Sequence, residues 1–279
     1  MVTTCALLFD FDGTLVDSIE ATKQATNRVL AEYGMSAVTS DQVVAGMRYE
    51  TAKRFRYHSG IEDPETLEQA AELYYELLVQ NAPAIRTVPG LFELIDQFRK
   101  RGIATGIVSN NRGDVVRGIL SGLDRLGSFD LVIGDGDGFR NKPSVDGITS
   151  MVNRLNVPRW RTAYIGDSDV DAETASAAGA FAVGFTMIRR LHQTKASSRF
   201  PRNADTVEKL ERTIENWLSL VDHHPRRDNG PKRLLFVRHC QSEANDQNIL
   251  ASRVDYPLTT TGIRDAERLS EELSRRFDV

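Results

Sequence analysis

Five short apolar runs in the first two thirds of the chain each predict a buried β-strand. They cover residues 5–9, 103–108, 129–133, 162–165 and 181–185. Runs of this length, bounded by glycine or acidic residues, are typical of strands that are buried on both faces. Helical patterns separate them, and strands that alternate with helices predict a parallel sheet with helices on both faces. The expected fold class is therefore α/β.

The spacing of apolar residues elsewhere predicts the helices. Apolar positions recur at helical spacing in residues 91–98, and residues 172–178 are rich in alanine, the best helix former. Residues 17–87 lack a strand pattern and contain further amphipathic helices, one of which is opened by Asp63-Pro64. This stretch predicts a small helical cap, inserted after the first strand, over the strand ends.

Composition limits the function classes without naming a partner. With 41% hydrophobic and 27% charged residues among 279, the chain is expected to be globular rather than disordered. Its 35 basic and 39 acidic side chains give a net charge of −4, which argues against a nucleic-acid or membrane partner. Two distant cysteines, Cys5 and Cys240, and no apolar segment long enough for a membrane span predict a cytoplasmic protein. Oligomeric state is not predicted.

Acidic residues follow two of the predicted strands. Asp10 and Asp12 stand two residues apart after the first strand, where alternation points both side chains the same way. Asp167 and Asp171 follow residues 162–165. If these strands are neighbours, the carboxylates converge, and such a charge requires protonation or a cation. Oxygen ligands without nearby histidine or cysteine favour Mg²⁺.

Other strand ends supply groups that suit a phosphoryl ligand. Ser109, Asn110 and Asn111 follow residues 103–108 and offer hydrogen bonds to phosphate oxygens, while Lys142 offers a point positive charge. A metal, a hydroxyl and a lysine together would neutralise a phosphoryl group while a carboxylate attacks it. The sequence therefore predicts a phosphoryl-transfer site.

Taken in their order along the chain, these motifs resemble the four motifs of the haloacid dehalogenase-like hydrolase superfamily. The four matches are Asp10-x-Asp12-Gly13-Thr14, Ser109, Lys142, and Gly166-Asp167-x-x-x-Asp171. The further match at residues 14–18 and the position of the cap are similar to the branch that holds phosphoglycolate phosphatase and β-phosphoglucomutase. The resemblance implies a Rossmann-like core at residues 1–16 and 88–220 with a cap at 17–87.

The resemblance also implies a role for each acidic residue. Asp10 would be the nucleophile that forms an aspartyl-phosphate, and Asp12 the general acid and then the base that activates water. Mg²⁺ would bind the Asp10 carboxylate, the Asp12 backbone carbonyl and Asp167. Aspartate at position 12 favours hydrolysis of a small phosphorylated metabolite, as in a phosphoglycolate phosphatase.

The remaining candidate residues would bind the substrate or support the site. Ser109 and Lys142, with Asn110, would hold the phosphoryl oxygens, and Asp171 would orient Lys142 or a metal-bound water. Arg48, in the cap, either contacts the substrate or is a solvated arginine at a helix end.

Three alternatives stay open at this point. The acids could merely cap loops and helices, as an N-cap after Asp167 would. The same site could belong to a phosphomutase, in which the phosphoryl group returns to a sugar when the closed cap excludes water. A non-catalytic protein that binds phosphorylated metabolites is a third possibility, which the presence of both Asp10 and Asp12 disfavours.

A second, shorter constellation follows a polar linker at residues 221–231. An apolar run at 233–237 ends in Arg238-His239, and Asn245 lies close behind. Residues 232–279 resemble the histidine phosphatase superfamily, which implies His239 as a phosphohistidine nucleophile, Arg238 as a phosphate ligand and Asn245 as a supporting contact.

This second segment is expected to be incomplete and inactive. Cys240 stands where relatives have glycine, and Val279 comes before the second histidine, second arginine and acidic residue of that family. Residues 232–279 would form only part of an α/β unit, too small to cover both faces of a parallel strand.

Overall fold

The computed structural model describes residues 5–47, 49–188, 199–222, 242 and 258–276. The chain divides into two compact units, Met1–His224 and Pro225–Val279, each of which is described by itself.

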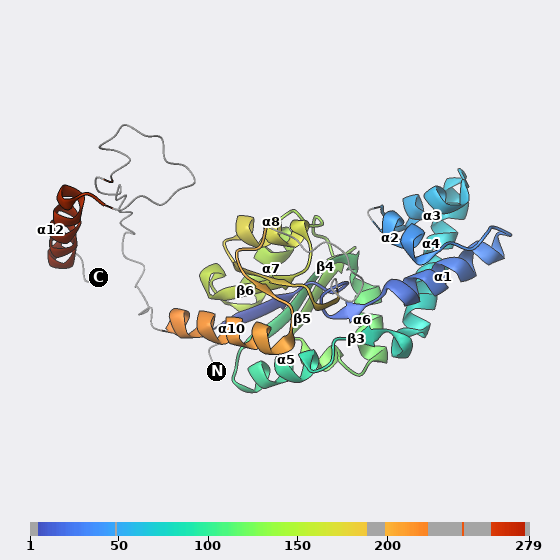
Figure 1. The fold of residues 1–279 in the computed structure, drawn as a ribbon. Coiled ribbons are helices and arrows are strands. Elements are labelled where there is room, and N and C mark those ends of the chain that lie inside the picture. Colours follow the sequence, from blue (N-terminus) through green and yellow to red (C-terminus); the bar gives the residue numbers. More distant parts are fainter. Residues whose placement is uncertain (1–4, 48, 189–198, 223–241, 243–257, 277–279) are drawn as a thin grey trace. The chain divides into compact units, whose positions relative to one another are not determined.

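A parallel sheet forms the centre of the first unit (Figure 1). Its strands, in spatial order, are β5 (Leu131–Asp135), β4 (Ala104–Arg112), β1 (Ala6–Phe9), β6 (Thr162–Gly166), β7 (Phe181–Phe185) and β8 (Asn203–Ala204). All neighbouring pairs are parallel. From β1 the chain first continues to one side through β4 and β5 and then to the other through β6. This reversal places a crevice at the carboxyl ends of the central strands.

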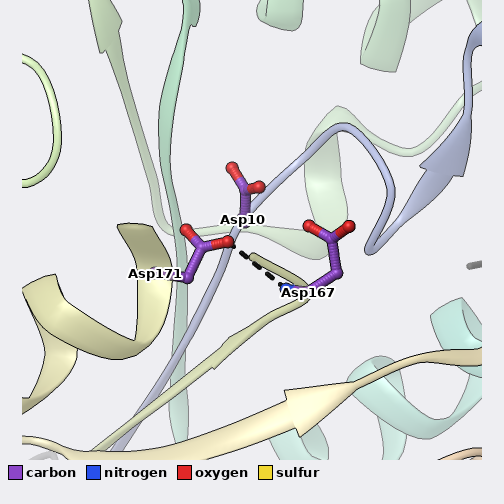
Figure 2. A group of neighbouring side chains, drawn as sticks. All are labelled: Asp10, Asp167 and Asp171. Atoms are coloured by element: carbon purple, nitrogen blue, oxygen red, sulfur yellow. Dashed lines mark hydrogen bonds between the residues drawn. The ribbon is translucent and has the colours of Figure 1, made fainter. Parts of the chain in front are cut away.

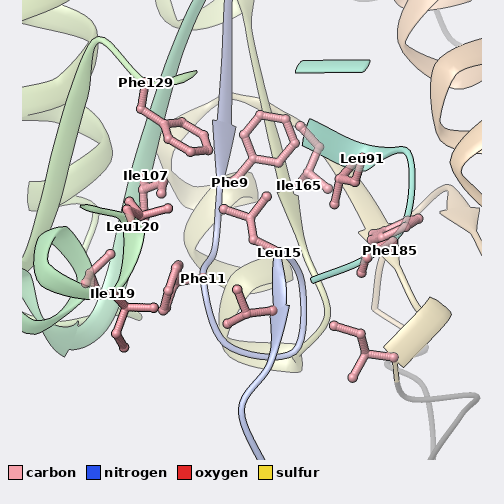
Figure 3. Close-up of a cluster of buried hydrophobic side chains, with 14 of the residues drawn as sticks. Phe9, Phe11, Leu15, Leu91, Ile107, Ile119, Leu120, Phe129, Ile165 and Phe185 are labelled. Carbon is pink, nitrogen blue, oxygen red and sulfur yellow. The ribbon is translucent and has the colours of Figure 1, made fainter. Parts of the chain in front are cut away.

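Helices cover both faces of the sheet. One face packs against α5 (Leu91–Lys100), α6 (Gly113–Gly122) and α10 (Val207–Asp222), and the other against α7 (Asp146–Leu155) and α8 (Asp169–Ala178). Side chains of β1 alternate between the two cores: Leu7 and Phe9 enter the first and Ala6 and Leu8 the second. Figure 3 shows Phe9 and Ile107 in the first core. The predicted α/β fold is confirmed.

Along the chain, four helices lie between the two strands of a small antiparallel ribbon. The ribbon is β2 (Val16–Asp17) paired with β3 (Arg86–Thr87), and the helices are α1 (Ile19–Glu32), α2 (Ser40–Gly46), α3 (Thr51–Ser59) and α4 (Pro64–Gln80). We call these four helices the cap; Figure 1 shows them beside the sheet. The ribbon overlaps a stretch in which the sequence showed no strand, because two-residue strands are too short to carry an alternating pattern. The exact domain boundaries stay a prediction.

Contacts from α4 hold the cap against the core. A Cβ atom on Gly118 of α6 would lie 2.9 Å from Cγ2 of Val79, so the two helices approach closely there. At the end of β4, Arg112 forms an ion pair with Glu72, and its guanidinium carbon lies 4.5 Å from the ring centroid of Tyr75. The cap is therefore fixed to the strand that carries Ser109.

In the second unit the structure describes one helix, α12 (Thr260–Arg276), and an antiparallel bridge between Ser242 and Leu258. The predicted linker at residues 221–231 lies almost entirely outside the described residues. In the described parts of both units, no helix combines the length and the apolar character that crossing a membrane requires. The cytoplasmic location stays a prediction.

Candidate functional site

Three buried carboxylates meet at the carboxyl ends of the two central strands. Asp10 follows β1, Asp167 follows β6, and Asp171 lies in the first turn of α8. One oxygen from each carboxylate lies within 4.8 Å of the others. Figure 2 shows the three side chains grouped together, with the main-chain N–H of Asp167 donating a hydrogen bond to Asp171. Because β1 and β6 are paired in register, their ends necessarily bring these acids together.

Lys142 lies among these carboxylates. Its Nζ atom donates hydrogen bonds to Oδ1 of Asp10 at 2.7 Å, to Oδ1 of Asp171 at 2.6 Å and to the hydroxyl of Tyr164 at 3.0 Å. The lysine comes from the loop between β5 and α7, and Asn110 fixes its main chain. The side chain of Asn110 accepts from the Lys142 N–H at 2.7 Å and donates to its carbonyl at 3.0 Å.

The charges around Lys142 do not balance. Burial raises the pKa of Asp10 well above its usual range, and the nearby carboxylate of Asp171 adds to this effect. Burial alone would also raise the pKa of Asp171, but Lys142 and Ser168 lower it overall. For Lys142, burial acts to lower the pKa, yet Asp10, Tyr164 and Asp171 raise it well above its usual range. One lysine therefore compensates Asp171 well and leaves Asp10 short of positive charge.

A capping box explains why Asp171 is so firmly held. Its Oδ2 atom accepts from the Ser168 hydroxyl at 2.5 Å and from the Ser168 N–H at 3.1 Å, while the Ser168 hydroxyl accepts from the Asp171 N–H. Its Oδ1 atom faces Lys142. This fully buried carboxylate thus joins the start of α8 to the lysine, as a positioning residue would.

Asp12, two residues after Asp10, is partly buried and is oriented from both sides. Its Oδ1 atom accepts a hydrogen bond from the Ser18 hydroxyl at 2.5 Å, and its Oδ2 atom accepts from the Asn111 side chain at 3.0 Å. The nearby Gly13 has a φ of 82°, and a Cβ there would lie only 2.6 Å from Oδ2 of Asp167. The turn after β1 therefore requires glycine to let the two acidic loops approach.

A cavity of about 550 Å³ opens over these groups and extends beneath the cap. The core contributes most of the predicted site residues to its lining: Asp10, Asp12, Ser109, Asn110, Lys142 and Asp167. The cap contributes residues from all four of its helices, including Thr22 of α1, Val44 of α2, Arg54 of α3 and Tyr74 of α4. Such a volume suits a small metabolite, part of which would contact the cap.

A family model for the haloacid dehalogenase-like hydrolases matches residues 7–185, which is more than half of the chain. The chain belongs to this family. The match spans β1 to β7 and includes the cap and all four carboxylates of the site. The predicted resemblance is thereby confirmed.

The names of several similar proteins support the assignment of this chain to the phosphatases among the hydrolases. Phosphoglycolate phosphatase from Pseudomonas savastanoi is 28% identical over 188 residues, covering 64% of this chain and 68% of its own length. Validoxylamine A 7'-phosphate phosphatase from Streptomyces hygroscopicus is 28% identical over 181 residues, covering 64% and 84%. A solved structure from Bacteroides fragilis, whose name places it among haloacid dehalogenase-like hydrolases, has a TM-score of 0.62 at 26% identity, covering 75% and 100%. The predicted enzyme class, a phosphatase hydrolase, is confirmed.

A second family model, the histidine phosphatase superfamily (branch 1), matches residues 234–279. The predicted resemblance of this segment is confirmed, but its three candidate residues, Arg238, His239 and Asn245, lie outside the described residues. The cap candidate Arg48 also lies outside them.

Two groups in the site of this hydrolase were not among the candidates from the sequence. Ser18, in the turn before α1, supports Asp12, and Tyr164 of β6 contacts Lys142. The apolar run that contains Tyr164 signals only a buried strand. A phenol within such a strand must find a hydrogen-bond partner, and this is the one signal that could have identified it.

We expect Tyr164→Phe to weaken the hydrolase without unfolding it. The Tyr164 hydroxyl, which accepts from Lys142, lies 2.9 Å from the Val108 carbonyl and 3.1 Å from Oδ1 of Asp171. Its loss leaves buried groups unsatisfied, at a cost of about 1–3 kcal/mol in the free energy of unfolding. Urea denaturation measures this cost, and kcat, measured with a phosphate ester, should fall roughly tenfold because Lys142 is less well held. Wild-type kcat together with wild-type stability would contradict this role for Tyr164.

Proposed function

We propose that this protein hydrolyses a small phosphate monoester in a Mg²⁺-dependent reaction through an aspartyl-phosphate on Asp10. The observation that carries the proposal is the cluster itself: Asp10, Asp12, Asp167 and Lys142 line one cavity at the carboxyl ends of β1 and β6. The names of the two phosphatase relatives support a phosphomonoester as the class of substrate.

The donor set fits a hard divalent cation. The carboxylates of Asp10 and Asp167 and the main-chain carbonyl of Asp12 would hold Mg²⁺, since it prefers oxygen ligands. Burial and the neighbouring carboxylate of Asp171 raise the pKa of Asp10 even though Lys142 acts to lower it, so a further positive charge would favour its ionised form. When bound, Mg²⁺ would add positive charge beside the phosphoryl oxygens and the carboxylates.

Asp10 would act as the nucleophile. Lys142 contacts its Oδ1 atom and favours its ionised form, in which the other oxygen would attack the phosphorus while the bond to the leaving oxygen breaks. The phosphoryl group would thereby be transferred to the Asp10 side chain. Lys142 and the Ser109 hydroxyl would stabilise the negative charge on the transferring oxygens.

Asp12 would move the protons. In its neutral form it would donate a proton to the leaving oxygen, and as a carboxylate it would then accept a proton from the water that attacks the aspartyl-phosphate. Cleavage of the bond between phosphorus and the Asp10 oxygen releases inorganic phosphate and restores the enzyme. Ser18 and Asn111 hold both oxygens of Asp12, which would limit its rotation between the two steps.

Phosphate release from a panel of small phosphate monoesters tests this proposal. With Mg²⁺ we expect turnover of at least one ester, and excess EDTA should reduce it by about 10²-fold or more, because charge stabilisation by the metal is lost. Added Mg²⁺ in excess should restore it. Undiminished turnover in EDTA would contradict the metal dependence, and absence of turnover on the whole panel would favour the non-catalytic alternative. Conversion of glucose 1-phosphate to glucose 6-phosphate would indicate a phosphomutase.

A further inference from the structure

The cap carries a buried positive charge that the proposed chemistry does not use. Arg54 of α3 is only 6% exposed, and its Nε and Nη2 atoms are buried without a hydrogen-bond partner. Its guanidinium carbon lies 4.4 Å from the ring centroid of Tyr74 on α4. An aromatic face stabilises a cation but accepts none of its N–H bonds in the guanidinium plane.

Buried guanidinium groups are normally paired, because an uncompensated charge in the protein interior is costly. Arg54 lines the same cavity as Asp10, Asp12 and Lys142, so a ligand in that cavity would lie beside its side chain. The charge of Lys142 is already shared between Asp10 and Asp171. A second anionic group on a bound substrate would therefore find its partner in Arg54.

Contacts within the cap hold Arg54 in place for this role. The hydroxyl of Tyr74 donates to the hydroxyl of Thr22 on α1 at 3.3 Å, which fixes the ring that the guanidinium faces. A Cβ atom on Gly46 would lie 3.1 Å from Cγ of Arg54, so α2 confines the side chain from another side. The planar N–H groups of arginine match the two oxygens of a carboxylate or a phosphoryl group.

We infer that Arg54 binds a second anionic group, a carboxylate or a second phosphoryl, on the part of the substrate that leaves with the ester oxygen. This inference rests on the proposed function and narrows its substrate class to doubly anionic metabolites. Arg54 would be a specificity-determining residue that recognises the leaving group, and the chemistry at Asp10 would remain as described.

Two matched pairs of esters test the inference. The pairs are 3-phosphoglycerate with glycerol 3-phosphate, and glucose 1,6-bisphosphate with glucose 1-phosphate. In each pair, only the first member carries the additional anion. The measured quantity is the ratio of kcat/KM within a pair. For Arg54→Gln we expect this ratio to fall about 10- to 100-fold in at least one pair, since hydrogen bonds to charged groups contribute that much. The change should appear mainly in KM, because the leaving group is bound equally in the ground and transition states.

Arg56→Gln is the matched control. Arg56 lies on the same helix, its side chain is 47% exposed, and its Nε atom is 3.4 Å from Glu62. This variant loses the same charge and should keep the wild-type ratio. Arg54→Lys keeps the charge without the planar N–H groups, so its ratio should lie between those of wild type and Arg54→Gln. The pair that responds tells whether the second anion is a carboxylate or a phosphoryl group.

Stability and binding separate the remaining outcomes. Arg54→Met should melt at or above the wild-type temperature, because it removes an unpaired buried charge. Equal losses on both members of each pair, or an unchanged ratio, would overturn the inference while the proposed function stands. If the wild type hydrolyses no ester, the proposed function fails. In that case the melting temperature is measured in the presence of 3-phosphoglycerate and of glycerol 3-phosphate. The inference holds only if 3-phosphoglycerate raises the melting temperature of the wild type more than glycerol 3-phosphate does, and if Arg54→Gln abolishes this difference.

Discussion

Asp10→Asn should lower kcat for phosphate ester hydrolysis on the order of 10⁴-fold or more, because an amide cannot form the covalent intermediate. The side chain is buried at the end of β1, faces the cavity and accepts a hydrogen bond from Lys142. Asparagine has the same shape and can keep that contact. The loss should therefore come from the chemistry and not from the fold.

Stability measurements make this distinction sharp. Because the pKa of Asp10 is raised in the folded protein, its ionised form destabilises the fold at neutral pH, above the pKa of the unfolded chain. Removing the charge should leave the melting temperature of the metal-free variant equal to or above that of the wild type. Asp169→Asn is the matched control, since Asp169 is exposed at the start of α8 and loses the same charge.

Trapping the intermediate completes the test. Acid quenching during turnover of a ³²P-labelled ester should leave label on the wild-type protein and on the control, and none on Asp10→Asn. Substantial activity of a folded Asp10→Asn protein would exclude Asp10 as the nucleophile.

Lys142→Met should damage both stability and activity. Its Nζ atom lies 2.7 Å from Asp10 and 2.6 Å from Asp171, so the substitution leaves two buried carboxylates without their cation. Breaking a buried pair in this way costs about 3–5 kcal/mol in the free energy of unfolding. The kcat should fall about 10³-fold or more, because the phosphoryl charge is no longer stabilised and Asp10 is harder to ionise.

The destabilisation by Lys142→Met should depend on pH. Without the lysine, burial and mutual repulsion keep the pKa values of Asp10 and Asp171 in the folded state above those of the unfolded chain. The cost is then fully present at neutral pH and shrinks as falling pH protonates the two carboxylates. Urea denaturation of the metal-free protein at several pH values measures this trend, and a cost that stays constant with pH would contradict it.

A double variant separates the two roles of Lys142. Lys142→Met/Asp171→Asn removes one of the stranded charges, so part of the lost stability should return while kcat stays low. Recovery of activity together with stability would mean that Lys142 acts only through the fold.

Several parts of the fold and the site could be predicted because they depend on local patterns. The apolar runs matched β1, β4, β5, β6 and β7, since a parallel strand buried on both faces requires apolar residues at almost every position. The shorter β2, β3 and β8 have two residues each and carry no such pattern. The cap helix α4 begins where Asp63-Pro64 indicated, with Asp63 accepting from the Thr66 N–H.

The remaining features of the site depend on contacts between distant segments. Asn110 was predicted as a substrate contact, and the structure shows its side chain engaged with the main chain of Lys142, 32 positions away. Its direct contact with substrate stays a prediction. Arg54 occupies an ordinary position in a helix, and no local pattern distinguishes it from a surface residue. For Tyr164 the one local signal is a phenol within an apolar strand, which does not tell which group it contacts.

By itself, the sequence determined the α/β class, the helical insertion after the first strand and which acids stand at strand ends, because periodicity and strand-end chemistry are encoded locally. Only the tertiary structure decided how charge is shared among Asp10, Lys142 and Asp171, and that Arg54 is buried without a partner beside the same cavity. Burial and pairing depend on which segments meet in space. These contacts set the charges that a substrate encounters, and no single stretch of the chain contains them.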